Sequence, residues 1–564
     1  MLQPVRTKNG FHLLGRTGKL IDNFEQRWLL TVPETNPAII TCFKERDKKP
    51  YRPLLPWSGE FAGKYITGTY YVYNITHNEE LKKVSEKFIF DLIDCMDTDG
   101  YLGCFKQGNH LTGRYNNGDL GTWDTWAHYH IMYGFYLWNM ILKKDEIDKA
   151  LYKMADLFIN TFYNGKMRMK ETGSTEMNLS PLHIFALLYL KTGKKKYLDF
   201  AKEIEEDIES PECGGYVSCM DSGNEFYRCR KPRWESLHPI MGINSLEECC
   251  NDPRYGETAE KVFYSILRTD VHNTGGFSTG EQACGTPFIN DPIELCCVIA
   301  FNALASEVYL KRPSVKIADF LERSYYNAIM GSYSPSGRWS TYNTPMEGVK
   351  RANYDWIVFQ SRAGSPDLNC CSANSGRGLG QLSTWAYAED GEDFYINLFE
   401  KASFETESGM KVKIRGDYPV KCVVNISVES DKKRRILIRV PEWADKTNIN
   451  GKTVPAGEYY PIEMDAGKIE IRVRIPLKVR FERGGLSYKG FKSWYYGPIL
   501  FGADMSVNDG DLAEIPKLKL ADFKRVRPVR DAETGRITMK LNNGVTLVDF
   551  YMLGQSGSEY RTWL

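Results

Sequence analysis

The sequence predicts a helical N-terminal part followed by an all-β C-terminal part, with the change near residue 390. Before that point, apolar residues recur at three- and four-residue spacing, and Gly, Pro or Asn stand at the breaks between segments. Beyond it, apolar residues alternate with polar and charged ones, which is typical of strands. The helical part has no repeat of fixed length, so a helical toroid or solenoid is expected rather than a regular TPR or HEAT array.

The helical periodicity extends over segments of moderate length, as expected when each helix buries one stripe of side chains against its neighbours. Side chains that can act in catalysis or bind a metal lie mostly in the loops between these segments. The predicted helices are residues 80–96, 123–142, 147–162, 181–190, 196–209, 257–267, 294–310 and 314–330, with a glycine-rich candidate at 372–387.

Four alternating segments in the second part predict antiparallel strands of a sandwich: MKVKIRGDYP, KCVVNISVES, RRILIRVPEW and GKIEIRVRIP. A second β stretch begins at residue 485 and includes WYYGPILFGA and GVTLVDFYML. We therefore expect three domains: a helical domain with an N-terminal extension at 1–388, a β-sandwich at 389–484 and a second β domain at 485–564.

Charge and hydropathy exclude two classes of function. The 564 residues contain 73 Lys+Arg and 72 Asp+Glu, which leaves no electrostatic case for nucleic acid or an anionic membrane as the main partner. The basic run at 517–530 is expected to be a solvated strand face. No apolar run approaches the length of a membrane span. Aromatic residues, at 13%, are frequent enough to line a cleft for sugars or flat ligands, or to fill a core.

The N-terminus has no apolar segment of the kind that a signal peptide requires. We expect a cytoplasmic protein, or an exported one from which a signal peptide has been removed. The 14 cysteines include three adjacent pairs, Cys249–Cys250, Cys296–Cys297 and Cys370–Cys371. Neighbouring cysteines rarely bond to each other, so reduced thiols used for metal binding or chemistry are expected.

Three segments combine carboxylates and thiols. GGFSTGEQACGTPF contains Glu281, DPIELCC contains Glu294 and Cys296, and DLNCCSANSGRG contains Cys370 and Cys371. One carboxylate and three thiols would make a tetrahedral zinc set, because soft sulfur ligands favour zinc over magnesium or calcium. The alternatives are buried helix cysteines at 296–297 and a structural zinc knuckle at 370–371. Spacing alone favours these alternatives, because such short motifs have many chance matches.

In this order, the three segments resemble the β-L-arabinofuranosidase family of glycoside hydrolases, whose nucleophile is a zinc-bound cysteine. Residues 322–348, 436–451 and 496–503 are also similar to segments of that family. The resemblance implies an (α/α)6 barrel followed by β-sandwich domains. It also implies a retaining exo-glycosidase that releases terminal β-L-arabinofuranosyl, or related furanosyl, residues from plant-type glycans.

The resemblance also assigns roles to single residues. Cys370 becomes the nucleophile and Glu281 the general acid/base, while Glu294, Cys296, Cys370 and Cys371 become ligands of Zn2+. A thiolate is the attacking species, and metal coordination deprotonates a cysteine at neutral pH. Two displacements through a thioglycosyl intermediate would give retention.

Further residues stand where the family contacts its sugar or lines its pocket. Each has a structural alternative, as a hydrogen-bonded barrel histidine or an inner-helix aromatic residue. The candidates for substrate binding are His130, His238, His128, Trp126 and Tyr342. Two departures mark a divergent member and leave the identity of its sugar open: Ser372-Ala373-Asn374 replaces the usual Pro-Pro-Asn, and Cys297 adds a thiol.

Three other functions remain open at this point: hydrolysis of a rarer acidic or branched pectic sugar, polysaccharide lyase chemistry, and sugar binding with a structural zinc. A glycan is the expected partner, without nucleic acid or membrane. The oligomeric state is left open, with a homodimer as one option.

Overall fold

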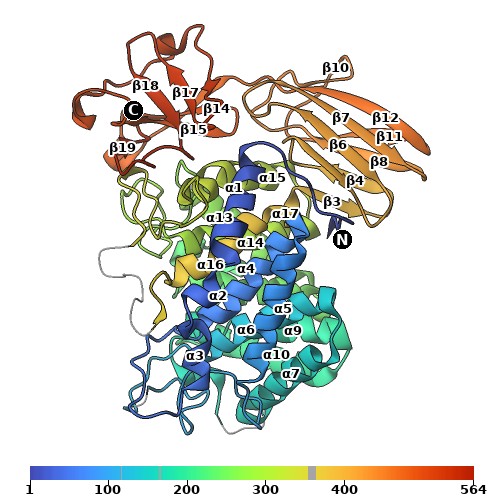
Figure 1. Ribbon diagram of the computed structural model, residues 1–564, viewed down its shortest axis with the longest axis vertical. Helices are drawn as coiled ribbons and strands as arrows, with labels where there is room; N and C mark the ends of the chain where they lie inside the picture. The colour runs from blue at the N-terminus through green and yellow to red at the C-terminus, as the bar shows by residue number, and fades with distance from the viewer. Residues whose placement is uncertain (116, 164–166, 354–363) are drawn as a thin grey trace.

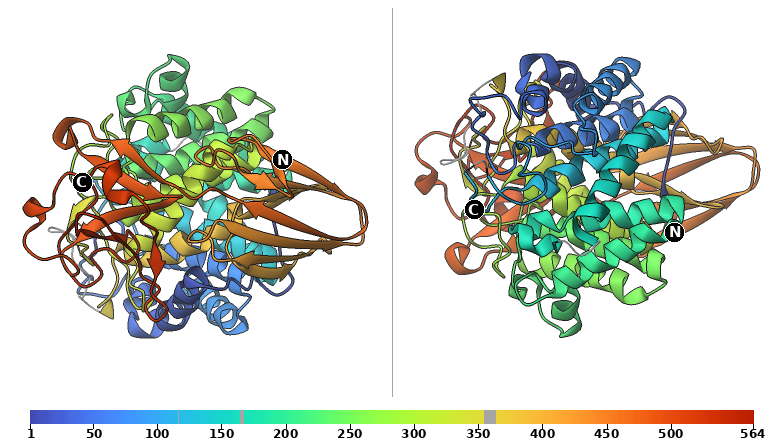
Figure 2. Two further views of the ribbon diagram at one scale, coloured as in Figure 1. Left: turned by 90° about the horizontal axis from the view of Figure 1, so that it is seen from above. Right: turned by 90° about the horizontal axis from the view of Figure 1, so that it is seen from below.

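The computed structural model describes residues 1–115, 117–163, 167–353 and 364–564. The helices form one body, and two β units lie side by side at its upper end, with the N-terminus beside β3 (Figure 1). Seen from below, the helices surround a common centre, as in an α/α barrel (Figure 2). The predicted order, helices first and strands after, is confirmed.

The helices predicted from periodicity are present, with ends shifted by a few residues. Side-chain caps mark the starts of some of them: Asn78 accepts a hydrogen bond from Glu80 N, and Asp252 accepts one from Arg254 N. They are α5 (Glu79–Ile93), α6 (Asp124–Leu142), α7 (Asp145–Phe158), α9 (Pro181–Thr192), α10 (Lys195–Glu209), α13 (Pro253–Thr269), α14 (Leu295–Lys311), α15 (Val315–Ser324), α16 (Cys370–Gly380) and α17 (Leu382–Trp385).

Periodicity missed several helices, and the longest of these are α1 (Arg16–Phe24), α4 (Glu60–Thr76) and α12 (Leu237–Cys250). Almost every side chain of α4 and α12 is buried, so neither helix has the polar face that creates a three-to-four spacing. Helix α4 is also rich in Tyr, Thr and Gly, which are weak helix formers, and its conformation depends on packing.

Helix α16 packs closely against α4 in the centre of the helical body. A Cβ atom added to Gly68 would lie 2.9 Å from the Cα of Gly376, and one added to Gly376 would lie 2.9 Å from the Cα of Gly68. Only two glycines allow backbones to approach so closely. The glycine-rich sequence after the Cys370–Cys371 pair thus sets the position of the helix that begins with that pair.

The first β unit is a sandwich of two sheets. One sheet has the order β1 (Gln3–Pro4), β3 (Tyr387–Asp390), β4 (Asp393–Ile396), β8 (Arg434–Arg439) and β11 (Tyr459–Met464). Its pairs are antiparallel except β4–β8, which is parallel. The chain's first strand therefore pairs with a strand that begins 384 residues later, and this pairing holds the N-terminal segment against the sandwich.

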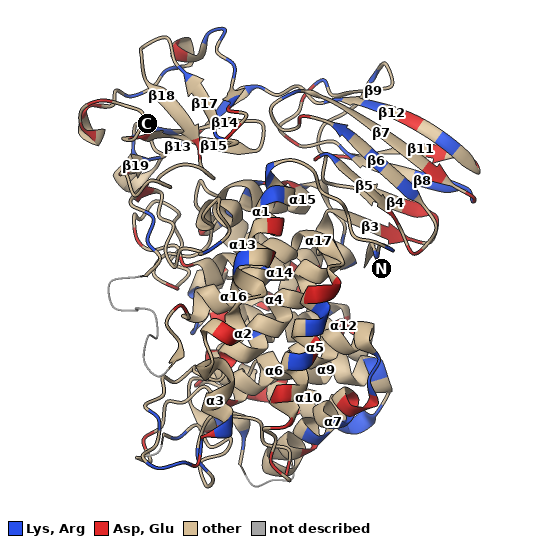
Figure 3. Ribbon diagram, in the orientation of Figure 1, with Lys and Arg blue, Asp and Glu red and all other residues tan. Residues whose placement is uncertain are grey.

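The facing sheet is antiparallel and has the order β10 (Lys452–Thr453), β9 (Asn448–Ile449), β12 (Gly467–Arg474), β7 (Val423–Ser430), β6 (Lys411–Gly416) and β5 (Ala402–Glu405). In β12, Ile471 and Val473 are buried while Glu470 and Arg472 are exposed, as the alternating sequence predicted. Figure 3 shows basic and acidic residues interspersed along these outer strands.

The second β unit is a sheet formed by β13 (Val479–Arg483), β14 (Lys492–Tyr496), β15 (Ile499–Asp504), β18 (Thr546–Asp549), β17 (Ile537–Lys540) and β16 (Val529–Arg530). Strand β19 (Tyr560–Arg561) pairs with β15 and with β2 (Glu347–Gly348), which belongs to the helical body. The run at 517–530 is largely exposed, but its strand content is limited to β16, so the strand part of that prediction is wrong. Among the described residues, none of the helices combines the length and apolarity that crossing a bilayer requires.

Candidate active site and metal site

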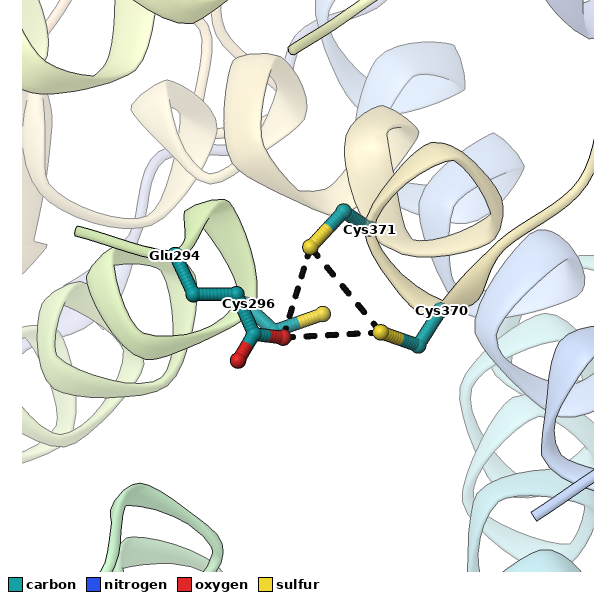
Figure 4. A group of neighbouring side chains, drawn as sticks. All are labelled: Glu294, Cys296, Cys370 and Cys371. Carbon is teal, nitrogen blue, oxygen red and sulfur yellow. Dashed lines mark hydrogen bonds between the residues drawn. The ribbon is translucent and has the colours of Figure 1, made fainter. Parts of the chain in front are cut away.

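Two helices begin at the same point in the centre of the helical body. Glu294 precedes the first residue of α14, and Cys296 lies in that helix's first turn. Cys370 and Cys371 are the first two residues of α16. We call Glu294, Cys296, Cys370 and Cys371 the metal-site cluster, and their side chains point toward one another (Figure 4).

A local cap holds the start of α16, and contacts with a distant segment hold the start of α14. Asn369 caps α16 by accepting a hydrogen bond from Ser372 N, and the Ser372 hydroxyl accepts one from Asn369 N. The serine that replaces the family's proline thus forms a capping box. On the other side, Tyr342 O accepts a hydrogen bond from Leu295 N, and Asn343 Oδ1 accepts one from Ile293 N. The N-termini of two helices therefore meet at the cluster, and their dipoles favour anionic ligands there.

The geometry of the cluster fits a four-coordinate metal ion. Its four ligand atoms all lie within 4.8 Å of one another. Glu294 Oε1 is 3.4 Å from Cys370 Sγ and 3.3 Å from Cys371 Sγ, and the two sulfurs are 3.9 Å apart. Tetrahedral bonds of about 2.3 Å to sulfur and about 2.1 Å to oxygen give edges of about 3.8 Å between sulfurs and about 3.6 Å between sulfur and oxygen. The donors are thus already spaced for such an ion.

Electrostatics also favour a cation at this point. Burial raises the pKa of Glu294 well above its usual range, and the nearby carboxylate of Glu281 adds to the shift. Burial likewise raises the pKa of the Cys371 thiol. All four cluster side chains are buried, so their charged forms repel one another at short range unless a cation stands between them.

One buried ammonium group adjoins the cluster. Lys64 Nζ donates a hydrogen bond to Glu60 Oε1 at 2.7 Å and lies 3.9 Å from Cys296 Sγ. Asn374 Nδ2 donates to the same sulfur at 3.6 Å. Cys296 thus has two N–H donors, which hold its sulfur in place and stabilise its thiolate form.

A cavity of about 220 Å³ opens beside the cluster. Of the cluster's residues, Cys370 and Glu294 line it, whereas Cys296 and Cys371 do not. The remaining lining residues are either aromatic or charged: Trp57, Glu60, Trp123, Arg233, Trp234, Glu235, Glu281 and Tyr342.

Glu281 faces Cys370 across the hydroxyl of Tyr342. That hydroxyl donates to Glu281 Oε1 at 3.4 Å and lies 3.8 Å from Cys370 Sγ. The other carboxylate oxygen of Glu281 accepts a hydrogen bond of 2.5 Å from Arg233. Glu281 has a φ angle of 68°, which is uncommon outside glycine and is held by the pairing of Arg233 and Thr279 with Gln282.

Glu235 is a second carboxylate of the cavity wall. Both of its oxygens accept hydrogen bonds from Arg233, at 2.8 and 2.9 Å. Burial raises the pKa of Glu235 to about 7, although the Arg233 guanidinium opposes the shift. Arg233 therefore lies between two carboxylates and joins them into one network.

The structure places the predicted sugar-binding residues in two layers. Tyr342 lines the cavity, while Trp126, His130 and His238 are buried behind its wall, with the Trp126 ring 4.4 Å from His130 and 4.8 Å from His238. Trp126 Nε1 donates to Glu60, and His238 Nδ1 is 3.0 Å from Tyr129 OH. Among the described residues, neither ring nitrogen of His130 has a hydrogen-bond partner.

His128 lies elsewhere. Its Nε2 accepts a hydrogen bond from Leu102 N at 3.1 Å, and its Nδ1 is 2.8 Å from Asp124 O. Both ring nitrogens of His128 are therefore used within the barrel, and neither is left for a sugar.

Sequence reasoning missed several residues of the cavity and its surroundings. Trp57 stands in a loop before α4, and Glu60 and Lys64 belong to the helix whose start periodicity did not reveal. The sequence contained one indication of Arg233, Trp234 and Glu235: they stand just before His238, which was predicted to bind substrate. Their closeness to His238 in the sequence was the signal that could have predicted these three residues.

Comparison with known proteins shows which family the chain resembles. The family model of the Beta-L-arabinofuranosidase, GH127 catalytic domain matches residues 25–384, and that of the GH127 middle domain matches residues 393–476. Among curated proteins, none matches the sequence significantly.

Solved structures share the fold along the whole chain. The GH127 β-arabinofuranosidase BT3674 has 17% identity and a TM-score of 0.79, over 100% of this chain and 97% of that one. Ara127N-Se, a GH127 β-L-arabinofuranosidase from Geobacillus stearothermophilus T6, has 15% identity and a TM-score of 0.78, over 98% and 99%. These likenesses establish the fold, and the catalytic-domain match covers more than half of the chain. The chain belongs to the GH127 β-L-arabinofuranosidase family of glycoside hydrolases.

Proposed function

We propose that this glycoside hydrolase is a retaining exo-enzyme that removes a terminal β-linked L-arabinofuranosyl, or related furanosyl, residue from plant-type glycans, with zinc held by the metal-site cluster. One observation carries the proposal. Among the cluster's three thiols, all within the described residues, Cys370 alone lines the cavity, and Glu281 lines the same cavity. A nucleophile and an acid/base thus face one space that can hold a substrate.

In the first step, the Cys370 sulfur attacks the anomeric carbon. A carbon–sulfur bond forms while the bond to the leaving oxygen breaks, and Glu281 gives its proton to that oxygen. In the second step, Glu281 takes a proton from water, whose oxygen attacks the same carbon and restores the thiolate. Two inversions give net retention. Bound zinc would supply the thiolate form of Cys370 at neutral pH.

Neighbouring residues support these roles. The Tyr342 hydroxyl contacts both Glu281 and Cys370, so it can keep the two groups at a fixed separation. Arg233 donates a hydrogen bond to Oε2 of Glu281. The other oxygen, Oε1, faces Tyr342 and can give and take the catalytic proton. His130 and His238 remain proposed substrate-binding residues, and the unpartnered nitrogens of His130 support this for that residue.

Cavity size and charge support a neutral monosaccharide unit. A space of about 220 Å³ suits one sugar ring, which agrees with exo-action. Four carboxylates line it, those of Glu60, Glu235, Glu281 and Glu294, and the two that flank Arg233 occupy its guanidinium. An acidic pectic sugar would bring a further negative charge, so the neutral furanosyl substrate is favoured.

Two experiments on one preparation test the proposal. Elemental analysis of the reduced wild type and of Cys370→Ala measures zinc per chain. Intact-mass spectrometry after treatment with an arabinofuranosyl bromoacetamide then looks for a covalent adduct. Stoichiometric zinc in the wild type and an adduct that maps to Cys370 are expected. Absence of zinc from reduced protein would overturn the mechanism, and zinc without an adduct across several furanosyl probes would favour a structural site.

The remaining alternatives predict different products. A lyase would release an unsaturated sugar, which absorbs ultraviolet light, and its activity would not need Cys370. A sugar-binding protein would release nothing, and Glu281→Gln would leave its ligand affinity unchanged. Product analysis on the wild type, Cys370→Ser and Glu281→Gln therefore separates the three functions.

A further inference from the structure

A second cavity lies within the helical body, away from the metal-site cluster. It has a volume of about 480 Å³ and is lined by the later turns of α14 and α16, by tyrosines of α4 and α6, and by the N-terminal segment at residues 3–6. The helices that begin at the metal-site cluster thus reach this cavity further along. None of its lining residues lines the cavity beside Cys370.

Arg377 is the buried cation of this cavity. The residue is 1% exposed and lies on α16, seven residues beyond Cys370, which corresponds to about 10 Å along a helix axis. Its guanidinium carbon lies 5.9 Å from the ring centre of Tyr71 and 5.6 Å from that of Tyr133. Gln381, with its amide suitably oriented, accepts a hydrogen bond of 2.9 Å from Arg377 Nε.

No carboxylate completes an ion pair with this guanidinium in the part of the chain that the structure describes. Three glutamates line the cavity, Glu307, Glu389 and Glu407, and of these Glu307 of α14 acts on the charge of Arg377. Its Oε1 lies 3.6 Å from His183 Nε2. Burial raises the pKa of Glu307 to about 7, so near neutral pH this side chain compensates less of the guanidinium's charge than an ordinary carboxylate would. A buried guanidinium therefore faces an open space with only partial compensation of its charge.

The polar groups around Arg377 suit an oxygen anion. The hydroxyls of Tyr71 and Tyr133 are 2.9 Å apart, and both residues line the cavity, so one hydroxyl proton remains for a ligand. A planar guanidinium offers two parallel N–H groups, which match the two oxygens of a carboxylate or two oxygens of a phosphate. Arg6, an exposed residue of the N-terminal segment, adds a second cation to the cavity lining.

We propose that this cavity is a binding site for a small oxygen anion, a carboxylate or inorganic phosphate, held by Arg377 and the hydroxyls of Tyr71 and Tyr133. The site is separate from the sugar cavity and does not depend on the proposed function. Its ligand would stabilise the packing of α4, α6, α14 and α16 around it, because an anion bound to the native state alone raises the folded population.

Thermal unfolding of the full chain tests the site. The wild type is titrated with sodium acetate, with sodium phosphate and with neutral acetamide, at constant ionic strength maintained with sodium chloride. A saturable rise in Tm with acetate or phosphate, and none with acetamide, is expected. The acetate and phosphate series show which anion the site prefers. If neither anion gives a saturable rise beyond that of chloride, the proposal is overturned.

Variants locate the effect. Arg377→Met should lose the saturable rise, whereas Arg472→Met, which changes an exposed arginine of β12, should retain it. Glu307→Gln removes the competing carboxylate and should tighten the apparent Kd several-fold, which provides a test even if Arg377→Met fails to fold. A rise that persists unchanged in Arg377→Met, or a Kd that Glu307→Gln leaves unchanged or weakens, would contradict the assignment to this cavity.

Discussion

The sulfur of Cys370 and a carboxylate oxygen of Glu294 lie 3.4 Å apart, although 76 residues separate the two in the chain. Each stands at the beginning of a central helix, α16 or α14, so two helix N-termini meet where acidic side chains converge. Helix N-termini favour negative charge, and thiolates and carboxylates are negative in the form that binds a metal ion. The two helix N-termini thus offset part of the cost of burying negative side chains at this point.

Replacing Cys370 should abolish turnover while a neighbouring thiol should be dispensable. Cys370→Ala is expected to lower kcat by about 10⁴-fold or more, because no other thiol of the cluster lines the cavity in the described structure. Cys297→Ala is the matched control, since Cys297 is buried beside Glu294 but does not line the cavity. Steady-state rates on an aryl β-L-arabinofuranoside measure both. Retention of kcat by Cys370→Ala would exclude it as the nucleophile.

Lys64 should affect metal binding rather than the chemical step. Lys64→Met removes the ammonium group that lies 3.9 Å from Cys296 Sγ, and it should weaken zinc affinity by about 10–100-fold. Competition with a chromophoric chelator measures that affinity directly. Lys82→Met, on the outer helix α5, should leave it unchanged. Equal affinities for the two variants would mean that the buried ammonium does not support the ligand set.

Tyr342→Phe should lower kcat by about 10–100-fold with little change in KM. The variant removes one hydroxyl that contacts Glu281 and Cys370, and hydrogen bonds to charged groups contribute about 1.5–3 kcal/mol. Tyr65→Phe serves as the control, because the Tyr65 hydroxyl donates to a backbone carbonyl, that of Leu29. A shifted pH profile of kcat would accompany the loss, and an unchanged profile with normal kcat would contradict the role.

The aromatic wall should set substrate affinity. Trp57 and Trp123 both line the cavity, with their ring centres 5.0 Å apart. Trp57→Ala should raise KM by about ten-fold and leave kcat nearly unchanged, whereas Trp57→Phe, which retains a ring, should stay close to the wild type. A fall in kcat without a change in KM would instead indicate that Trp57 positions the reacting groups.

Stability should rise with pH above neutrality because of one buried lysine. Burial lowers the pKa of Lys350 to about 7, and its Nζ donates to Phe550 O at 2.8 Å, where the helical body meets the second β unit. Between about pH 7 and 10.5 the unfolded chain holds a proton on this lysine that the native state lacks, so the free energy of unfolding increases with pH.

Lys350→Met should remove this increase, which is on the order of 3 kcal/mol between pH 7 and 9.5. Urea unfolding of both proteins across this range measures the difference. Lys468→Met replaces an exposed lysine of β12 and should keep the wild-type slope. If the free energy of unfolding of Lys350→Met rises with pH as steeply as that of the wild type, the buried lysine is not the cause.

Periodicity found the outer helices and strands and some central helices, such as α14, but it missed the central helices α4 and α12. Helices such as α13 and strands such as β12 each have one buried and one solvated face, and the pattern of the sequence records that difference. Helices α4 and α12 are buried on almost all sides, so their sequences contain no such contrast. Periodicity therefore did not predict α4, the helix that supplies Glu60 and Lys64.

The sequence by itself determined the class of the protein and the order of its parts, and its resemblance to a known family singled out the four side chains that the structure brings together as the metal-site cluster. These depend on local pattern and on short motifs, which the chain carries in linear order. Tertiary structure alone decided which thiol lines the cavity, that Arg233 links Glu281 to Glu235, and that Trp57 joins the wall. Such relations arise when helices from distant segments pack around one centre, and no local pattern encodes the distance between them.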